Sequence, residues 1–131
     1  MPPVDLAEAG WHVRTGQFVW RPPGRHSPGL AGELLVARHP DGRSFLQFSK
    51  DPLQLVVAQT TREFWRIDFG FRQRSFGGRG NPSPRLVWFQ LGHAENLASL
   101  PPAWRAEYRA DGEIRLANES TGELLEGYLS P

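Results

Sequence analysis

The chain has 131 residues, of which 39% are hydrophobic and 22% charged, and this is the composition of one soluble globular domain. Its formal net charge of +1 argues against a general binder of polyanions. The lack of cysteine excludes disulfides and thiolate sites, and no apolar run approaches the roughly twenty residues of a membrane-spanning helix.

The first nine residues contain neither a basic head nor an apolar stretch, so they are not a signal peptide as they stand. We expect residues 1–9 to be a flexible N-terminal segment. Residues 10–131 are predicted to form a single β-rich domain, because prolines and glycines divide them into short segments typical of a β meander.

The first half of the chain reads as consecutive strands. Trp11–Trp20 predicts an extended segment with a bulge at Gly16. The turn signals that follow separate four further segments, which we predict to be a meander: Leu30–Arg38, Arg43–Ser49, Leu53–Gln59 and Glu63–Phe69. Alternation places Leu53, Leu55 and Val57 on one face of their strand, and Trp65, Ile67 and Phe69 on one face of theirs.

The second half is less regular. Gly70–Pro84 is rich in glycine and arginine and is predicted to be an exposed connection. Pro84 and Gly92 favour a short helix over Arg85–Leu91, although its β-branched and aromatic content would also suit a strand. Leu100–Trp104 is predicted to be a turn, and the closing hairpins are predicted from three segments: Glu107–Arg109, Ile114–Ala117 and Leu124–Leu129. The chain is therefore predicted to be mainly β, an antiparallel sheet of about six or seven strands with one or two short helices.

No constellation for chemistry is evident. The four histidines, His12, His26, His39 and His93, have no spacing that would aim two of them at one metal ion. Glu63 and Asp68 differ in strand parity, so they point to opposite faces and form no acid–base pair. No nucleophile elbow is present. We predict a binding protein without catalytic residues, metal or cofactor; an enzyme whose site only the fold assembles is the third alternative.

Two features suggest binding. Arg72, Arg74 and Arg79 lie among phenylalanines, so they either form a solvated loop or contact phosphates, in nucleic acid or in anionic headgroups. The strands between Leu30 and Val57 are apolar on both faces, which leaves either an apolar groove for an acyl chain or a core that the curved sheet closes on itself. We favour the solvated loop for the arginines and keep the two readings of the strands open.

The order of these parts resembles the LolA/LolB-like family of periplasmic lipoprotein carriers and outer-membrane lipoprotein receptors. The similarity extends over most of the chain and rests on five features: Gly16–Trp20, the strand pair ending in Asp51-Pro52-Leu53, Glu63–Phe69, Leu86–Gly92 followed by Leu100-Pro101 and Trp104, and the hairpin-rich tail. It implies a curved antiparallel sheet, an incomplete β barrel with helices at its open side, and an apolar cavity for lipoprotein acyl chains.

The same resemblance implies a periplasmic location, or tethering to the outer membrane through a lipidated N-terminal cysteine. This chain departs from the pattern in lacking that cysteine and in its low helical content, which puts lipoprotein transfer itself in doubt. An anchor could exist only in a segment that precedes these residues.

Our functional hypothesis is the binding of an acyl chain, a lipoprotein or another apolar ligand by a monomer, near a membrane surface in the cell envelope. The predicted cavity wall consists of Leu55, Val57, Trp65, Ile67 and Phe69, and the predicted lid of Trp88 and Phe89. The alternative hypothesis is nucleic-acid or anionic-surface binding by the loop 70–85, with Arg72, Arg74 and Arg79 as contacts.

Overall fold

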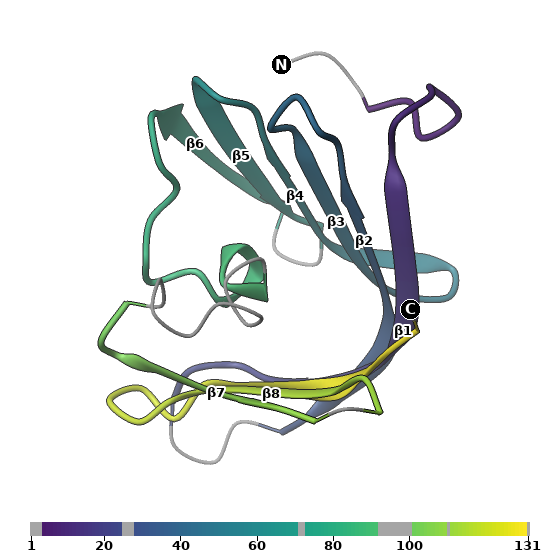
Figure 1. Ribbon diagram of the computed structural model, residues 1–131. Helices are drawn as coiled ribbons and strands as arrows, with labels where there is room; N and C mark the ends of the chain where they lie inside the picture. Colours follow the sequence, from purple (N-terminus) through teal and green to yellow (C-terminus); the bar gives the residue numbers. More distant parts are fainter. Residues whose placement is uncertain (1–3, 25–27, 71–72, 92–100, 110, 131) are drawn as a thin grey trace. The chain divides into compact units, whose positions relative to one another are not determined.

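The part of the chain that the structure describes forms one open antiparallel sheet of nine strands (Figure 1). This computed structural model describes residues 4–24, 28–70, 73–91, 101–109 and 111–130. The strands are β1 (His12–Arg21), β2 (Leu30–Arg38), β3 (Ser44–Lys50), β4 (Leu53–Thr60), β5 (Phe64–Phe69), β6 (Arg74–Arg79), β7 (Trp104–Tyr108), β8 (Glu113–Asn118) and β9 (Leu124–Leu129). Their order across the sheet is β6-β5-β4-β3-β2-β1-β9-β8-β7, so β6 and β7 are its two terminal strands.

The predicted antiparallel sheet is confirmed, and so is the four-stranded meander from β2 to β5. The number of strands was underestimated because the prediction of an exposed connection over Gly70–Pro84 was wrong for Arg74–Arg79. These residues form β6, which pairs along its whole length with β5. All six are exposed, so no alternation of apolar and polar residues marks them as a strand.

The short helix predicted over Arg85–Leu91 is also wrong. Within the described residues this region contains only a 3-10 turn, η1 (Val87–Phe89). Val87, Trp88, Gln90 and Leu91 are all buried, so the segment is held by packing around it rather than by one amphipathic face. A side-chain hydrogen bond also holds the segment: Gln90 Nε2 donates to the Leu86 carbonyl at 3.1 Å.

The chain divides by its internal contacts into two compact units. The first contains residues 1–15 and 33–82, and the second contains residues 16–32 and 83–131. The boundary crosses β1 and β2, so each of these strands contributes residues to both units.

The core of the first unit lies on one face of the sheet. Antiparallel residues that stand opposite each other point to the same face, and the register aligns Leu34 with Phe48 and Phe48 with Val56. It likewise aligns Leu46 with Ala58 and Ala58 with Ile67. All six side chains are buried, so this face of β2 to β5 forms the core of the unit.

The second unit has its own core, in which Trp20, Leu125 and Leu116 are aligned across β1, β9 and β8. All three are buried, and Trp88 packs edge-on against Trp20 with ring centroids 5.0 Å apart. Trp104, which was predicted to anchor a turn, is buried at the start of β7 and donates from Nε1 to the Pro84 carbonyl at 2.7 Å.

Gly16 has a structural reason other than the predicted bulge. The ladder between β1 and β9 ends at the Gly16–Leu129 pair and shows no register shift from there to Arg21–Leu124, so the bulge at Gly16 stays a prediction. A Cβ atom at position 16 would lie 1.6 Å from the Tyr128 carbonyl oxygen and 2.6 Å from its carbonyl carbon. The residue is therefore glycine because the backbone of β9 occupies the space of a side chain.

Candidate binding site

An open groove of about 770 Å³ runs along β5 and β6 in the first unit, a volume within the range of small-molecule sites. Three aromatic side chains and two arginines are among the residues that line it. The lining residues are Thr61, Phe64, Trp65, Arg66, Ser75, Phe76, Gly77, Gly78 and Arg79.

The aromatic side chains of the groove are open to solvent. Phe76 is 48% exposed and Phe64 is 42% exposed. The indole of Trp65 lies over Gly78, since a Cβ atom at position 78 would stand 3.1 Å from Trp65 Nε1. A glycine opposite Trp65 therefore leaves the ring room to extend towards the outer strand.

Charge is placed next to these rings. The guanidinium of Arg79 lies 5.8 Å from the centroid of the Phe64 ring, a cation–π arrangement. Arg66 forms an ion pair with Asp68 at 3.2 Å, and the Ser75 hydroxyl donates to the same carboxylate oxygen. The Asp68 carboxylate is therefore engaged, whereas Arg79 presents its charge beside an exposed ring.

The predicted cavity wall is only partly brought together. Trp65, Ile67 and Phe69 share a face of β5, as predicted, and Phe76 of β6 is aligned with Ile67 on that face. The register instead aligns Val57 with Asp68, on the opposite face. Leu55 is buried in β4, in the stretch where the β3–β4 register shifts between Phe48 and Ser49. Of the predicted wall, only Trp65 lines the groove.

The predicted lid residues, Trp88 and Phe89, belong to η1 in the second unit. Trp88 is buried against Trp20 and Phe89 is half-buried. Their role as a lid stays a prediction. Of the predicted anionic contacts, Arg74 and Arg79 lie exposed on β6 rather than in a loop, while Arg72 falls outside the described residues.

A buried carboxylate in the second unit was not predicted from the sequence. Glu123 is 6% exposed, and Trp20 Nε1 donates to its Oε2 at 2.9 Å. Burial raises the pKa of Glu123 from 4.5 to about 7, and the bond from Trp20 opposes this increase only partly. Nothing in Thr121-Gly122-Glu123 indicates burial, because a glutamate after a Thr-Gly turn is ordinarily solvated.

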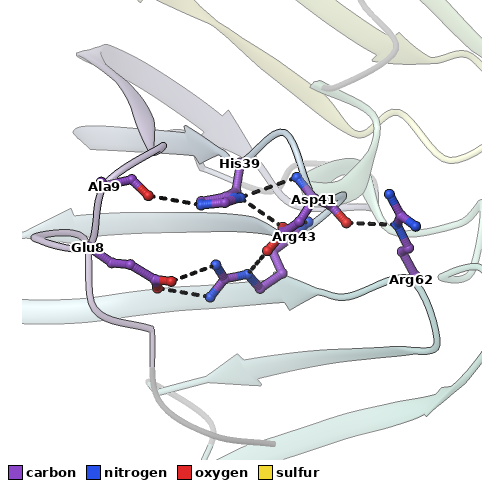
Figure 2. A network of polar contacts seen from close by, with 6 residues as sticks. All are labelled: Glu8, Ala9, His39, Asp41, Arg43 and Arg62. Atoms are coloured by element: carbon purple, nitrogen blue, oxygen red, sulfur yellow. Dashed lines mark hydrogen bonds and ion pairs between the residues drawn. The ribbon is translucent and has the colours of Figure 1, made fainter.

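A polar network connects the N-terminal turn to the β2–β3 hairpin in the first unit (Figure 2). Arg43 donates to both Glu8 carboxylate oxygens at 3.1 Å and from Nε to Asp41 Oδ2 at 2.7 Å. His39 Nε2 lies 3.0 Å from the Ala9 carbonyl oxygen, and Arg62 Nε donates to the Asp41 carbonyl at 2.7 Å. The Arg43 guanidinium also lies 5.2 Å from the centroid of the Trp11 ring.

Arg43 keeps both acids of this network ionised. Its side-chain bonds lower the pKa of Glu8. At Asp41, desolvation acts to raise the pKa, but the backbone and side-chain bonds from Arg43 outweigh it, and the pKa is lowered. These carboxylates are therefore poor proton donors, and the network serves to hold residues 5–9 against the hairpin. The flexibility expected for residues 1–9 stays a prediction.

We expect Arg43→Gln to release this turn without unfolding the protein, because an exposed ion pair contributes little to global stability. The amides of Ala7 and Glu8 should exchange roughly tenfold faster with solvent, and the denaturation midpoint should change little. Residue-resolved hydrogen exchange measures this, with Arg38→Gln at the exposed end of β2 as the matched control. Unchanged exchange at residues 7 and 8 would contradict the role given to Arg43.

No protein-family model matches the chain, and no curated protein sequence matches it. In the described segments, no group of three or more histidine or acidic side chains is arranged to hold a metal ion. A search of the same segments found no helix with the length and hydropathy needed to cross a membrane.

Proposed function

We propose that the chain binds an anionic amphiphile, an aliphatic chain with a carboxylate or phosphate head, in the groove along β5 and β6. The observation that supports this is the pairing of exposed aromatic surface with an arginine on one face of the groove: Phe64, 42% exposed, offers contact to the aliphatic chain, and Arg79, 5.8 Å from the centroid of its ring, offers charge to the head. This proposal keeps the acyl chain as the ligand but places its binding site at residues other than the predicted cavity wall. Lipoprotein handling in the cell envelope is the setting that the family resemblance implies.

The proposal is tested with two small probes, decanoate and decanol, which share a chain and differ in charge. Displacement of a fluorescent fatty acid should give saturable binding of decanoate. We expect Phe64→Ser to weaken both probes about fivefold to tenfold, because it removes part of the apolar contact beside Arg79. Arg79→Gln should weaken decanoate about fivefold and leave decanol unchanged, because a partly exposed charge contact contributes about 1 kcal/mol.

The matched control is Tyr108→Ser, since Tyr108 is an exposed aromatic residue, 44% accessible, on the other terminal strand of the sheet. It should bind both probes as the unmodified protein does. No saturable decanoate binding, or equal loss in Tyr108→Ser and Phe64→Ser, would overturn the proposal. A native mass spectrum of freshly purified protein tests independently for lipid that copurifies.

Single-stranded nucleic acid is the second candidate ligand, because Arg74 and Arg79 are exposed beside Phe76 on the same strand. Bases could stack on the rings while the arginines contact phosphates. If this function is correct, the chain binds oligothymidylate, and the affinity falls steeply as the salt concentration rises. The binding is lost when Arg72, Arg74 and Arg79 are replaced together. Binding that survives this triple replacement would exclude it.

A further inference from the structure

The outer edge of β6 presents backbone groups, in addition to the side chains with which the strand lines the groove. β6 is a terminal strand of the sheet (Figure 1). All six of its residues are exposed. A terminal strand presents one row of peptide groups that its own sheet does not pair. Extended segments of partner proteins bind such edges by adding a strand.

The register identifies which peptide groups form this row. Gly80 N–H donates to the Glu63 carbonyl at 2.8 Å, so residues 80 and 63 face each other in a hydrogen-bonded position. Hydrogen-bonded and non-hydrogen-bonded pairs alternate along an antiparallel ladder. Ser75, Gly77 and Arg79 therefore stand in non-hydrogen-bonded pairs with β5, and their N–H and C=O groups point away from it.

The positive charge of β6 favours a partner strand with negative charge. The strand carries Arg74 and Arg79 and no acidic residue. Arg74 is aligned with Phe69 and Arg79 with Phe64, so the two arginines lie on opposite faces of the sheet. A second copy of β6 would bring four arginines together without an acid, which disfavours self-pairing, whereas an acidic strand would neutralise both charges.

We propose that β6 binds an extended acidic segment of a partner protein as an additional antiparallel strand. The partner residues opposite Arg79 and Arg74 are acidic and lie five positions apart, one on each face. The residue opposite Phe76 is apolar, and the residue opposite Gly78 is aromatic because Trp65 covers that position. This surface is formed by the outward peptide groups of the edge, and residues 75–79, which carry it, also line the groove.

The test uses a fluorescein-labelled peptide, Gly-Ser-Glu-Tyr-Thr-Val-Thr-Glu-Ser-Gly, and the full chain. Fluorescence anisotropy should show saturable binding. A peptide with the second glutamate exchanged with the preceding threonine has the same charge but the wrong spacing, and it should bind about fivefold more weakly. The same sequence with lysines in place of the glutamates should not bind. In the protein, exchange of the Ser75, Gly77 and Arg79 amides should slow on addition of the first peptide.

A matched pair of variants separates the backbone from the side chain. Ser75→Ala and Ser75→Pro both remove the hydroxyl, but only proline also removes the outward N–H, so Ser75→Pro should bind the peptide about tenfold more weakly than Ser75→Ala. Circular dichroism establishes that both variants fold. Equal binding by the two folded variants, equal binding of the lysine peptide, or no change in amide exchange in the unmodified protein would overturn the proposal.

The two proposed ligands can fail separately. If the unmodified protein binds decanoate but not the peptide, only the strand-addition surface is rejected. If it binds the peptide but not decanoate, only the amphiphile groove is rejected. Self-association of the chain through β6, measured by sedimentation, would replace the acidic partner with a second copy and overturn the charge argument.

Discussion

Replacing Glu123 with glutamine is expected to raise the free energy of unfolding by about 2–3 kcal/mol at pH 8 and to leave it nearly unchanged at pH 4.5. The pKa of this carboxyl is raised from 4.5 to about 7 because the group is buried. Between pH 4.5 and about pH 7, the carboxyl group loses its proton in the unfolded chain but keeps it in the folded protein. The free energy of unfolding therefore falls as pH rises through this window, and glutamine, which stays neutral, removes the fall.

The glutamine side chain also preserves the local bond, because its carbonyl oxygen can accept from Trp20 Nε1 as Glu123 Oε2 does. Urea denaturation, followed by tryptophan fluorescence at several pH values, measures the effect. The control is Glu119→Gln, an exposed glutamate two residues from the same turn, 66% accessible. The control should follow the pH profile of the unmodified protein. Parallel profiles for Glu123→Gln and the unmodified protein would show that Glu123 does not titrate in this way.

Gly16→Ala is expected to destabilise the protein by at least about 3 kcal/mol. The methyl group would stand 1.6 Å from the Tyr128 carbonyl oxygen, and the atoms that it meets belong to the backbone of β9, which no rotamer change can move aside. The ladder that joins Gly16–Arg21 to Leu124–Leu129 would have to open. Urea denaturation gives the loss, and a chain that does not fold at all agrees with the same expectation.

Gly29→Ala is the matched control for this substitution. The nearest atom to a Cβ at position 29 is Val19 Cγ1 at 3.1 Å, a side-chain atom of a residue that is 41% exposed and can move. Its cost should be about 1 kcal/mol or less. A Gly16→Ala protein as stable as Gly29→Ala would show that β1 and β9 can separate locally at little expense.

The strands that the sequence predicted correctly are those whose pattern is local. From β2 to β5, apolar residues alternate or run together between clear turn signals such as His39-Pro40-Asp41-Gly42, and burial follows that pattern. β6 shows no such pattern because all of its residues are exposed. Its strand conformation comes from pairing with β5, and the residues of β6 taken alone give no information about that pairing.

The candidate site depended on information that single strands do not carry. Parity along β5 grouped Trp65, Ile67 and Phe69 correctly, but parity between strands is set by register, and the register aligns Val57 with Asp68. The arginines were recognised as a cluster, yet their placement on opposite faces of β6 follows only from pairing. Glu123 was missed because its burial results from packing near Trp20, 103 positions away along the chain.

The division of β1 between the two units has a consequence for how the protein is made. On the ribosome, the residues of the first unit emerge by Pro82 and can begin to fold together. The segment 16–21, which carries Phe18 and Trp20, must wait for β9, the second of the two strands beside β1. During that interval β1 can pair only with β2, and Phe18 and Trp20 lack the neighbours that β9 supplies. Nascent chains stalled before Leu124 should therefore be the species that recruits chaperones and aggregates, and synthesis of the last strand should end that vulnerability.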